Sequence, residues 1–261
     1  MDRTNYRPPT EHAKVNQFAI RCFRDTGDGD YIAARMAMRA RLGVQFFWSA
    51  EQAIEKYLKC ILMLNRRDTA DLSHKIDAAL KRINSDLPFH IDLSKPERQV
   101  FDHVCEWDSD RYLIGSFHLM DNEVAKLDLL VWRLRQYCQP LDVVHYADAP
   151  SEAVLLTNIK RIEAGMEGPA KSGHLSHGVL EQVLAKKEHP AREALVWKNF
   201  RYSGRHRNVI GYSSGFQAVN APLWLHPELA DEAAKWMKIP PSIIRECHSL
   251  VKERKRTGKH P

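Results

Sequence analysis

The stretch DRYLIGSFH, residues 110–118, places an arginine and a histidine close together, with six residues between Arg111 and His118. Histidine can take up or release a proton near neutral pH, and a guanidinium group can stabilise negative charge that develops during a reaction. These two side chains are therefore candidates for a catalytic pair. In the alternative interpretation, Arg111 pairs with Asp108 or Asp110 and His118 caps a helix.

A second arginine and histidine, Arg201 and His206, lie in the basic stretch KNFRYSGRHR, and no acidic residue occurs between Glu193 and Glu228. Basic groups that contact phosphates, beside aromatic rings that stack on bases, are typical of single-stranded RNA binding. The alternative is a basic surface loop whose aromatic rings pack inward. The predicted RNA-binding residues are Lys198, Arg201, Tyr202, Arg205, His206 and Arg207.

The excess of basic residues lies in the second half of the chain. Residues 1–140 carry 21 Lys and Arg against 20 Asp and Glu, whereas residues 141–261 carry 18 against 13. This imbalance favours a polyanionic partner for the C-terminal part, or a solvated basic end in KERKRTGKH. No apolar run reaches the roughly 18 residues that span a membrane, and the N-terminus lacks an apolar signal sequence. We therefore expect a cytoplasmic protein.

Neither a metal nor a cofactor is expected. The five cysteines are scattered without a CxxC pair, and no cysteine or acid accompanies His174 and His177 at the spacing of a zinc finger. On the segment from residue 44 to 65, Glu51, Glu55, Lys56 and Lys59 either face a nucleotide or form the solvated edge of a helix. In the second case Glu55 and Lys59 are an i,i+4 pair.

Apolar residues at helical spacing must position these groups, and strand patterns are nearly absent. The segment VQFFWSAEQAIEKYLKCILMLN is apolar over much of its circumference, which is typical of a central helix. Ser94 and Glu97 have the spacing of a capping box at the start of a later helix. We predict an all-α protein with three parts: an N-terminal arm (1–24), an antiparallel helical bundle (25–140) and a basic, helical, loop-rich extension (141–261) packed on the bundle.

Residues 25–140 resemble the HEPN family (higher eukaryotes and prokaryotes nucleotide-binding). The resemblance lies in a helix pair with a short break, in SAEQAIEKYLKCILMLN and in SHKIDAAL, although Lys75 stands where the family usually has an acid. It implies a small all-α domain that dimerises through its helices. Many members are metal-independent endoribonucleases of toxin or defence systems, with four to six residues between an arginine and a histidine. Others are non-catalytic and partner a nucleotidyltransferase-like protein.

The spacing of Arg111 and His118 is the longest that this motif allows, but Tyr112 follows the arginine where nuclease members usually have Asn, Asp or His. Catalysis would transfer the 2′-hydroxyl proton of RNA and leave a 2′,3′-cyclic phosphate without a metal. The sequence thus predicts a HEPN-type RNA- or nucleotide-binding homodimer, either a ribonuclease or a non-catalytic binding module. A purely structural scaffold is the third interpretation.

Overall fold

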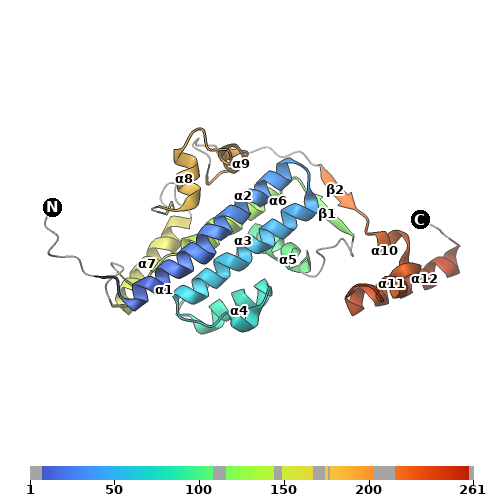
Figure 1. Ribbon diagram of the computed structural model, residues 1–261, viewed down its shortest axis with the longest axis horizontal. Helices are drawn as coiled ribbons and strands as arrows, with labels where there is room; N and C mark the ends of the chain where they lie inside the picture. The colour runs from blue at the N-terminus through green and yellow to red at the C-terminus, as the bar shows by residue number, and fades with distance from the viewer. Residues whose placement is uncertain are drawn as a thin grey trace.

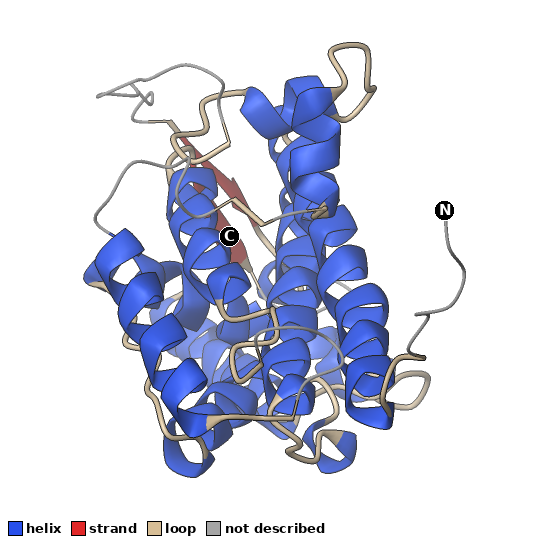
Figure 2. Cartoon of the chain, turned by 90° about the vertical axis from the view of Figure 1, so that its left-hand side faces the viewer, coloured by secondary structure: helices blue, strands red, loops and turns tan. Residues whose placement is uncertain are grey.

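The computed structural model describes residues 8–107, 116–143, 149–166, 174–175, 177–202 and 215–258. It is a mostly helical protein, as predicted, in which long helices run side by side (Figures 1 and 2). The bundle consists of α1 (Glu11–Ala19), the π-helical turn η2 (Ile20–Arg24), α2 (Asp25–Arg39), α3 (Gly43–Leu64), the 3-10 turn η3 (Ala70–Leu72), α4 (Ile76–Asp86), α5 (Lys95–Trp107) and α6 (Glu123–Gln136).

Helix α3 is the centre of the bundle. Its apolar residues are buried around nearly the whole circumference, as their spacing predicts, and Phe46, Ile54, Tyr57 and Ile61 are each 0% exposed. Burial of a large aliphatic or aromatic side chain contributes about 1.5–3 kcal/mol, so α3 is the main source of hydrophobic stabilisation. The Glu97 half of the predicted capping box is present, because the backbone N–H of Ser94 donates to Oε2 of Glu97 at 2.7 Å.

The N-terminal part differs from the predicted arm. The side chain of Thr10 caps α1 by accepting from the backbone N–H of Ala13 at 3.2 Å, and the helical path then continues through η2 into α2. The proposed boundary at residue 24 therefore falls inside a continuous helical run. This run starts early because Ala13, Ala19 and Ile20 bury against the rest of the core.

A two-stranded antiparallel ribbon was not predicted. It pairs β1 (Phe117–Met120) with β2 (Phe216–Val219), and His118 lies opposite Ala218. Gly43 permits the ribbon to approach the start of α3, because a Cβ atom there would lie 2.7 Å from the Phe117 ring. The ribbon therefore joins the end of the bundle to the C-terminal part of the chain.

The extension has two portions. The first contains α7 (Glu152–Met166), α8 (Val179–Ala185) and α9 (Arg192–Val196), and its Ile159, Leu180 and Leu195 belong to the bundle core. The second follows the ribbon and has a small core of its own around Leu223 and Cys247. Figure 1 shows this portion standing beside the bundle rather than on it. It contains α10 (Pro222–Leu225), the 3-10 turn η5 (Pro227–Leu229), α11 (Ala230–Ala233) and α12 (Pro241–Thr257).

Two buried arginines attach the first portion to the bundle. Arg135 of α6 binds two carboxylates at once: its Nε and Nη2 donate to Asp28 at 2.7 and 2.8 Å, and its Nη1 and Nη2 donate to Glu181 at 2.7 Å each. Arg35 of α2 donates to Asp128, to the carbonyl of Ala194 at 2.9 Å and to the carbonyl of Trp197. The backbone after α9 is therefore fixed by a side chain of α2.

The Arg135–Glu181 pair should make stability depend on pH. Burial alone would raise the pKa of the Glu181 carboxyl, but the Arg135 guanidinium outweighs it and holds the pKa below its ordinary value. A carboxyl whose pKa is lower in the folded state contributes stability above the unfolded pKa of about 4.3, and this is lost as the pH falls through the folded value. We expect urea unfolding at pH 7 and at about pH 3.5 to show a smaller acid-induced loss of stability in Glu181→Gln than in the wild type.

Glu193→Gln is the matched control for that measurement, because Glu193 also accepts from an arginine, Arg39 at 2.6 Å, but is 78% exposed. Its acid dependence should equal that of the wild type, since exposed pairs contribute little. If Glu181→Gln also lost as much stability in acid as the wild type, the Arg135–Glu181 pair would not be a source of the pH dependence.

Candidate functional site

A cavity of about 140 Å³ lies where α2, α9 and the ribbon meet, and we call it the basic pocket. Three of its lining side chains are cationic: Arg39 and Arg41 at the end of α2, and Lys198 after α9. The indole of Trp197 forms one wall. The remaining lining residues are Met38, Leu119, Asp121 and Gln217. Because Arg39 also pairs with Glu193 at 2.6 Å, the three cations face two acids and leave one net positive charge beside the indole. This arrangement suits an anionic, phosphate-bearing ligand.

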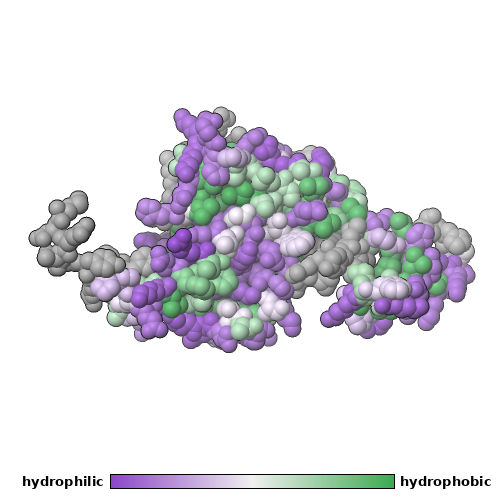
Figure 3. All heavy atoms as spheres, viewed as in Figure 1, coloured by the Kyte–Doolittle hydropathy of each residue, from purple (hydrophilic) through white to green (hydrophobic). Residues whose placement is uncertain are grey.

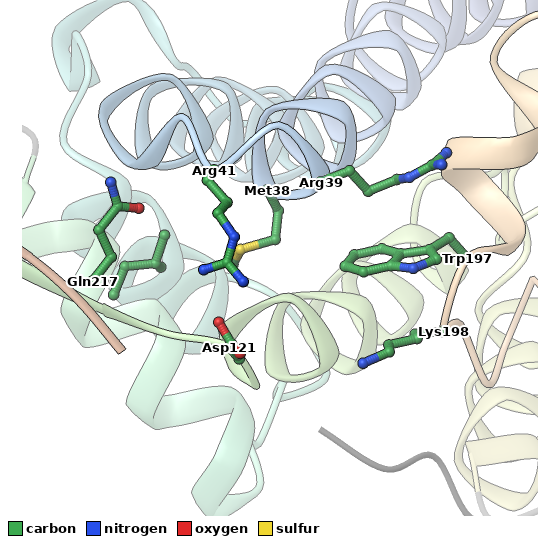
Figure 4. Close-up of a pocket in the computed structure, with 8 residues that line it drawn as sticks. Met38, Arg39, Arg41, Asp121, Trp197, Lys198 and Gln217 are labelled. Atoms are coloured by element: carbon green, nitrogen blue, oxygen red, sulfur yellow. The ribbon is translucent and has the colours of Figure 1, made fainter. Parts of the chain in front are cut away.

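The cations of the basic pocket are arranged around the indole. The Arg39 guanidinium carbon lies 5.8 Å from the centroid of the Trp197 ring, and the Lys198 ammonium lies 5.7 Å from it. Figure 4 shows these two side chains on either side of the indole, with Arg41 on the other side of the pocket, near Asp121. Cation–π contacts of this kind hold the positive charges at the rim, within reach of an entering phosphate.

Two of these cations stand at backbone positions that L-residues rarely adopt. Arg41 has φ 57° and Lys198 has φ 47°. The left-handed conformation costs a residue with a Cβ atom roughly 1–2 kcal/mol, which a glycine would avoid. Both residues follow the end of a helix, so the chain retains long basic side chains where glycine would be the more stable choice. Such strain is an indication of function.

The ribbon carries a second candidate group, the predicted His118. Its side chain is exposed on β1, and its ring stacks on that of His103 from α5, with 4.9 Å between centroids and 26° between planes. Nδ1 of His103 lies 3.7 Å from Oε2 of Glu123. The His103 ring also contacts Phe47, with 4.6 Å between the ring centroids. His118 is thus part of a strand and does not cap a helix.

Glu123 is a buried carboxylate held by cations. Its Oε1 accepts from Lys126 at 2.8 Å, while its Oε2 is buried and accepts no hydrogen bond from the described residues. Burial raises the pKa of Glu123, but His103 and Lys126 together bring it below the ordinary value. The group is therefore an anion positioned against His103. We call His118, His103 and Glu123 the histidine stack.

The predicted RNA-binding residues separate in the structure. Lys198 lines the basic pocket. Arg201 lies with its guanidinium carbon 5.2 Å from the Trp132 ring and donates to the carbonyl of Met166 at 3.2 Å, so it holds the extension to the bundle. Burial lowers the pKa of Arg201.

Tyr202 corrects the prediction of an RNA-stacking ring. It is 0% exposed and packs against Trp132 and His174, with ring centroids at 5.5 and 5.7 Å. Neither face is accessible to a base, and the inward-packing alternative holds for this residue. Its ring instead fills the junction between the bundle and the extension. The remaining predicted residues, Arg111, Arg205, His206 and Arg207, lie outside the described part of the chain.

The carboxylates of α3 are not a solvated edge. Glu51 and Glu55 are 3% and 7% exposed. Glu55 accepts from Lys59 at 2.6 Å, as the i,i+4 spacing predicts, and its other oxygen lies 2.8 Å from Nδ1 of His74. Donor atoms of Glu51, Glu55 and His74 lie within 4.8 Å of one another. The segments SAEQAIEKYLKCILMLN and SHKIDAAL therefore meet here, in a network that already contains a cation, Lys59.

Sequence reasoning did not select Arg39, Arg41, Trp197, His103 or Glu123. Trp197 and Lys198 are adjacent in the sequence, and the tryptophan directly before KNFRYSGRHR was a usable signal. Nothing in the sequence pairs them with the end of α2, because that contact depends on how α9 docks. The same holds for His103, which meets His118 only after β1 forms.

Comparisons of this chain with protein-family models, with curated proteins and with solved structures found no match. Among the described residues, none of the helices combines the length and the apolar character that crossing a membrane requires.

Proposed function

We propose that this chain is an RNA- or nucleotide-binding protein of the HEPN type and that the basic pocket holds the phosphate. The observation that carries the proposal is that Arg39, Arg41 and Lys198 all line one cavity beside Trp197. Phosphate contacts from Arg and Lys supply most of the affinity of non-specific nucleic-acid binding. The predicted residues Arg205, His206 and Arg207 follow in the sequence and are proposed to extend the same contact.

Glycine substitutions test the pocket without damaging the fold. Arg41→Gly and Lys198→Gly each remove a cation and relieve a left-handed backbone position, so we expect stability to be unchanged or to rise by about 1 kcal/mol. Affinity for single-stranded RNA should fall about 3- to 10-fold per variant, and the salt dependence of binding should become weaker. Fluorescence anisotropy and thermal unfolding measure both quantities.

Ser73→Gly is the control, because Ser73 has φ 48° but lies far from the pocket in the sequence and does not line it. It should also be stabilised, since its φ 48° and ψ −123° favour glycine, and it should bind RNA like the wild type. Equal RNA affinity in all three variants and the wild type would exclude the pocket as the phosphate site.

Metal-independent RNA cleavage is the second candidate function, and the histidine stack favours it. His118 is exposed and stacks on a second imidazole, His103, whose side chain is 13% exposed. Two imidazoles can serve as the proton acceptor and the proton donor of the cleavage reaction. Arg111, which precedes β1 in the chain, is proposed to stabilise the charge on the phosphorane.

The alternative is a non-catalytic binding or dimerisation module that docks a second copy or a nucleotidyltransferase-like partner. Phe18, Met36 and Trp48 of the bundle are about half exposed, at 53%, 52% and 49%. Figure 3 shows green, apolar side chains gathered over parts of the bundle surface. Such patches are typical of protein contacts. Light scattering of the purified protein would distinguish a homodimer from a monomer.

A further inference from the structure

We propose that His103 is the second proton-transfer group of an RNA-cleaving site, that it protonates the leaving 5′-oxygen while His118 takes the 2′-hydroxyl proton, and that Glu123 positions it. The inference rests on the proposed cleavage activity and deepens it. It assigns roles to two residues, on α5 and α6, that lie outside the DRYLIGSFH stretch.

The geometry of the stack suits two proton transfers at one phosphorus atom. The ring centroids of His118 and His103 are 4.9 Å apart and their planes are nearly parallel. A proton-transfer group must come within about 2.6–3.2 Å of its oxygen. Two imidazoles at this separation can therefore reach the attacking and the leaving oxygen of a single phosphodiester.

The reaction balances with these groups alone. His118 removes the proton of the 2′-hydroxyl, and the 2′-oxygen forms a bond to phosphorus. The bond from phosphorus to the 5′-oxygen breaks, and that oxygen takes the proton of His103. The products are a 2′,3′-cyclic phosphate and a 5′-hydroxyl end. His118 now carries the proton that His103 has lost, so solvent exchange restores both rings.

Glu123 is the positioning residue. Its anionic Oε2 faces Nδ1 of His103 at 3.7 Å, an ion-pair distance that is longer than a hydrogen bond. With Nδ1 directed at the carboxylate, Nε2 is the ring nitrogen left to donate to the substrate. Phe47, whose ring lies 4.6 Å from that of His103, restrains the imidazole further.

A leaving-group experiment separates an acid from a structural residue. We would compare wild type, His103→Phe and His118→Ala in excess chelator on a single-stranded RNA and on uridine 3′-(4-nitrophenyl phosphate). The second substrate releases nitrophenolate, which needs no proton. His103→Phe retains an aromatic plane between Phe47 and His118, and His103→Asn is a second variant that retains polarity. Circular dichroism and thermal unfolding verify that each variant folds.

We expect His103→Phe and His103→Asn to cleave RNA at least about 10²-fold more slowly, and to cleave the activated substrate within about tenfold of the wild type. His118→Ala should lose both activities. Glu123→Gln should also slow the cleavage of RNA more than that of the activated substrate. Glu123→Asp should cleave RNA faster than Glu123→Gln, because it restores the anion.

The failures are distinguishable. If wild type cleaves neither substrate, the proposed cleavage activity is wrong, and so is the proposed role of His103. If wild type cleaves both but His103→Phe retains full RNA cleavage, only the role of His103 is wrong. Equal losses on both substrates in His103→Phe would show that the residue acts by holding the stack and not as an acid.

Discussion

Replacing Arg135 by methionine is expected to lower the free energy of unfolding by about 3–5 kcal/mol. The guanidinium is 0% exposed and is the only cation that the described structure gives to Asp28, which is itself 0% exposed. Methionine fills much of the arginine volume but leaves that carboxylate buried and unpaired. The loss of Glu181 contacts also weakens the attachment of α8, so the extension should open before the bundle does.

Urea unfolding of Arg135→Met measures the effect, and Arg98→Met is its control. Arg98 of α5 also faces a carboxylate, Asp102 at 3.5 Å, but both side chains are about half exposed. The control should change stability by less than about 0.5 kcal/mol, because exposed pairs contribute little. If Arg135→Met lost as little unfolding free energy as the control, the buried Arg135 network would not be what joins the extension to the bundle.

The helical part of this fold could be predicted because its signal is local. The apolar residues of α3 recur at helical spacing, and Phe46, Ala50, Ala53, Tyr57 and Cys60 on this stripe are all 0% exposed. The Ser94–Glu97 cap is equally local. The continuous run from residue 11 to 39 was missed because Gly27, Asp28, Gly29 and Asp30 indicate a break. Burial of Gly27 and pairing of Asp28 with Arg135 override that local preference.

The ribbon and the basic pocket could not be predicted from local patterns. Strand β1 has four residues, and its partner lies far along the chain, so neither segment shows the alternation of a longer strand. The pocket combines the end of α2 with the end of α9, and this pairing depends on Arg35 reaching the carbonyl of Trp197. Tyr202 failed as an RNA-contact prediction for the same reason, because its aromatic ring fills the core at this junction.

His118→Ala is expected to abolish any metal-independent RNA cleavage, with a loss of about 10²–10⁴-fold. The residue is the exposed member of the histidine stack and comes from a strand that packs against the start of α3, so its position is fixed. Truncation removes the stacking contact with His103 and should lower the free energy of unfolding by no more than about 1 kcal/mol. The measurement is cleavage of labelled RNA in excess chelator, with the ends tested for cyclic phosphate.

His248→Ala is the control, since His248 is also an exposed histidine but lies on α12, where it pairs with Asp231 at 2.9 Å and has no part in the stack. It should cleave like the wild type. Equal cleavage by His118→Ala and wild type would remove the stack from the mechanism, and cleavage lost only on mutation of His206 would move the site into the extension.

Crosslinking tests the central proposal, that RNA binds at the basic pocket, most directly. Single-stranded RNA would be crosslinked by ultraviolet light to the full chain, and the modified peptides would be identified by mass spectrometry. We predict adducts on the peptide that contains Trp197, lost when excess unlabelled RNA competes and reduced in Arg41→Gly. Adducts confined to the basic helix α12, around Arg254, would contradict the pocket and place RNA on the C-terminal portion instead.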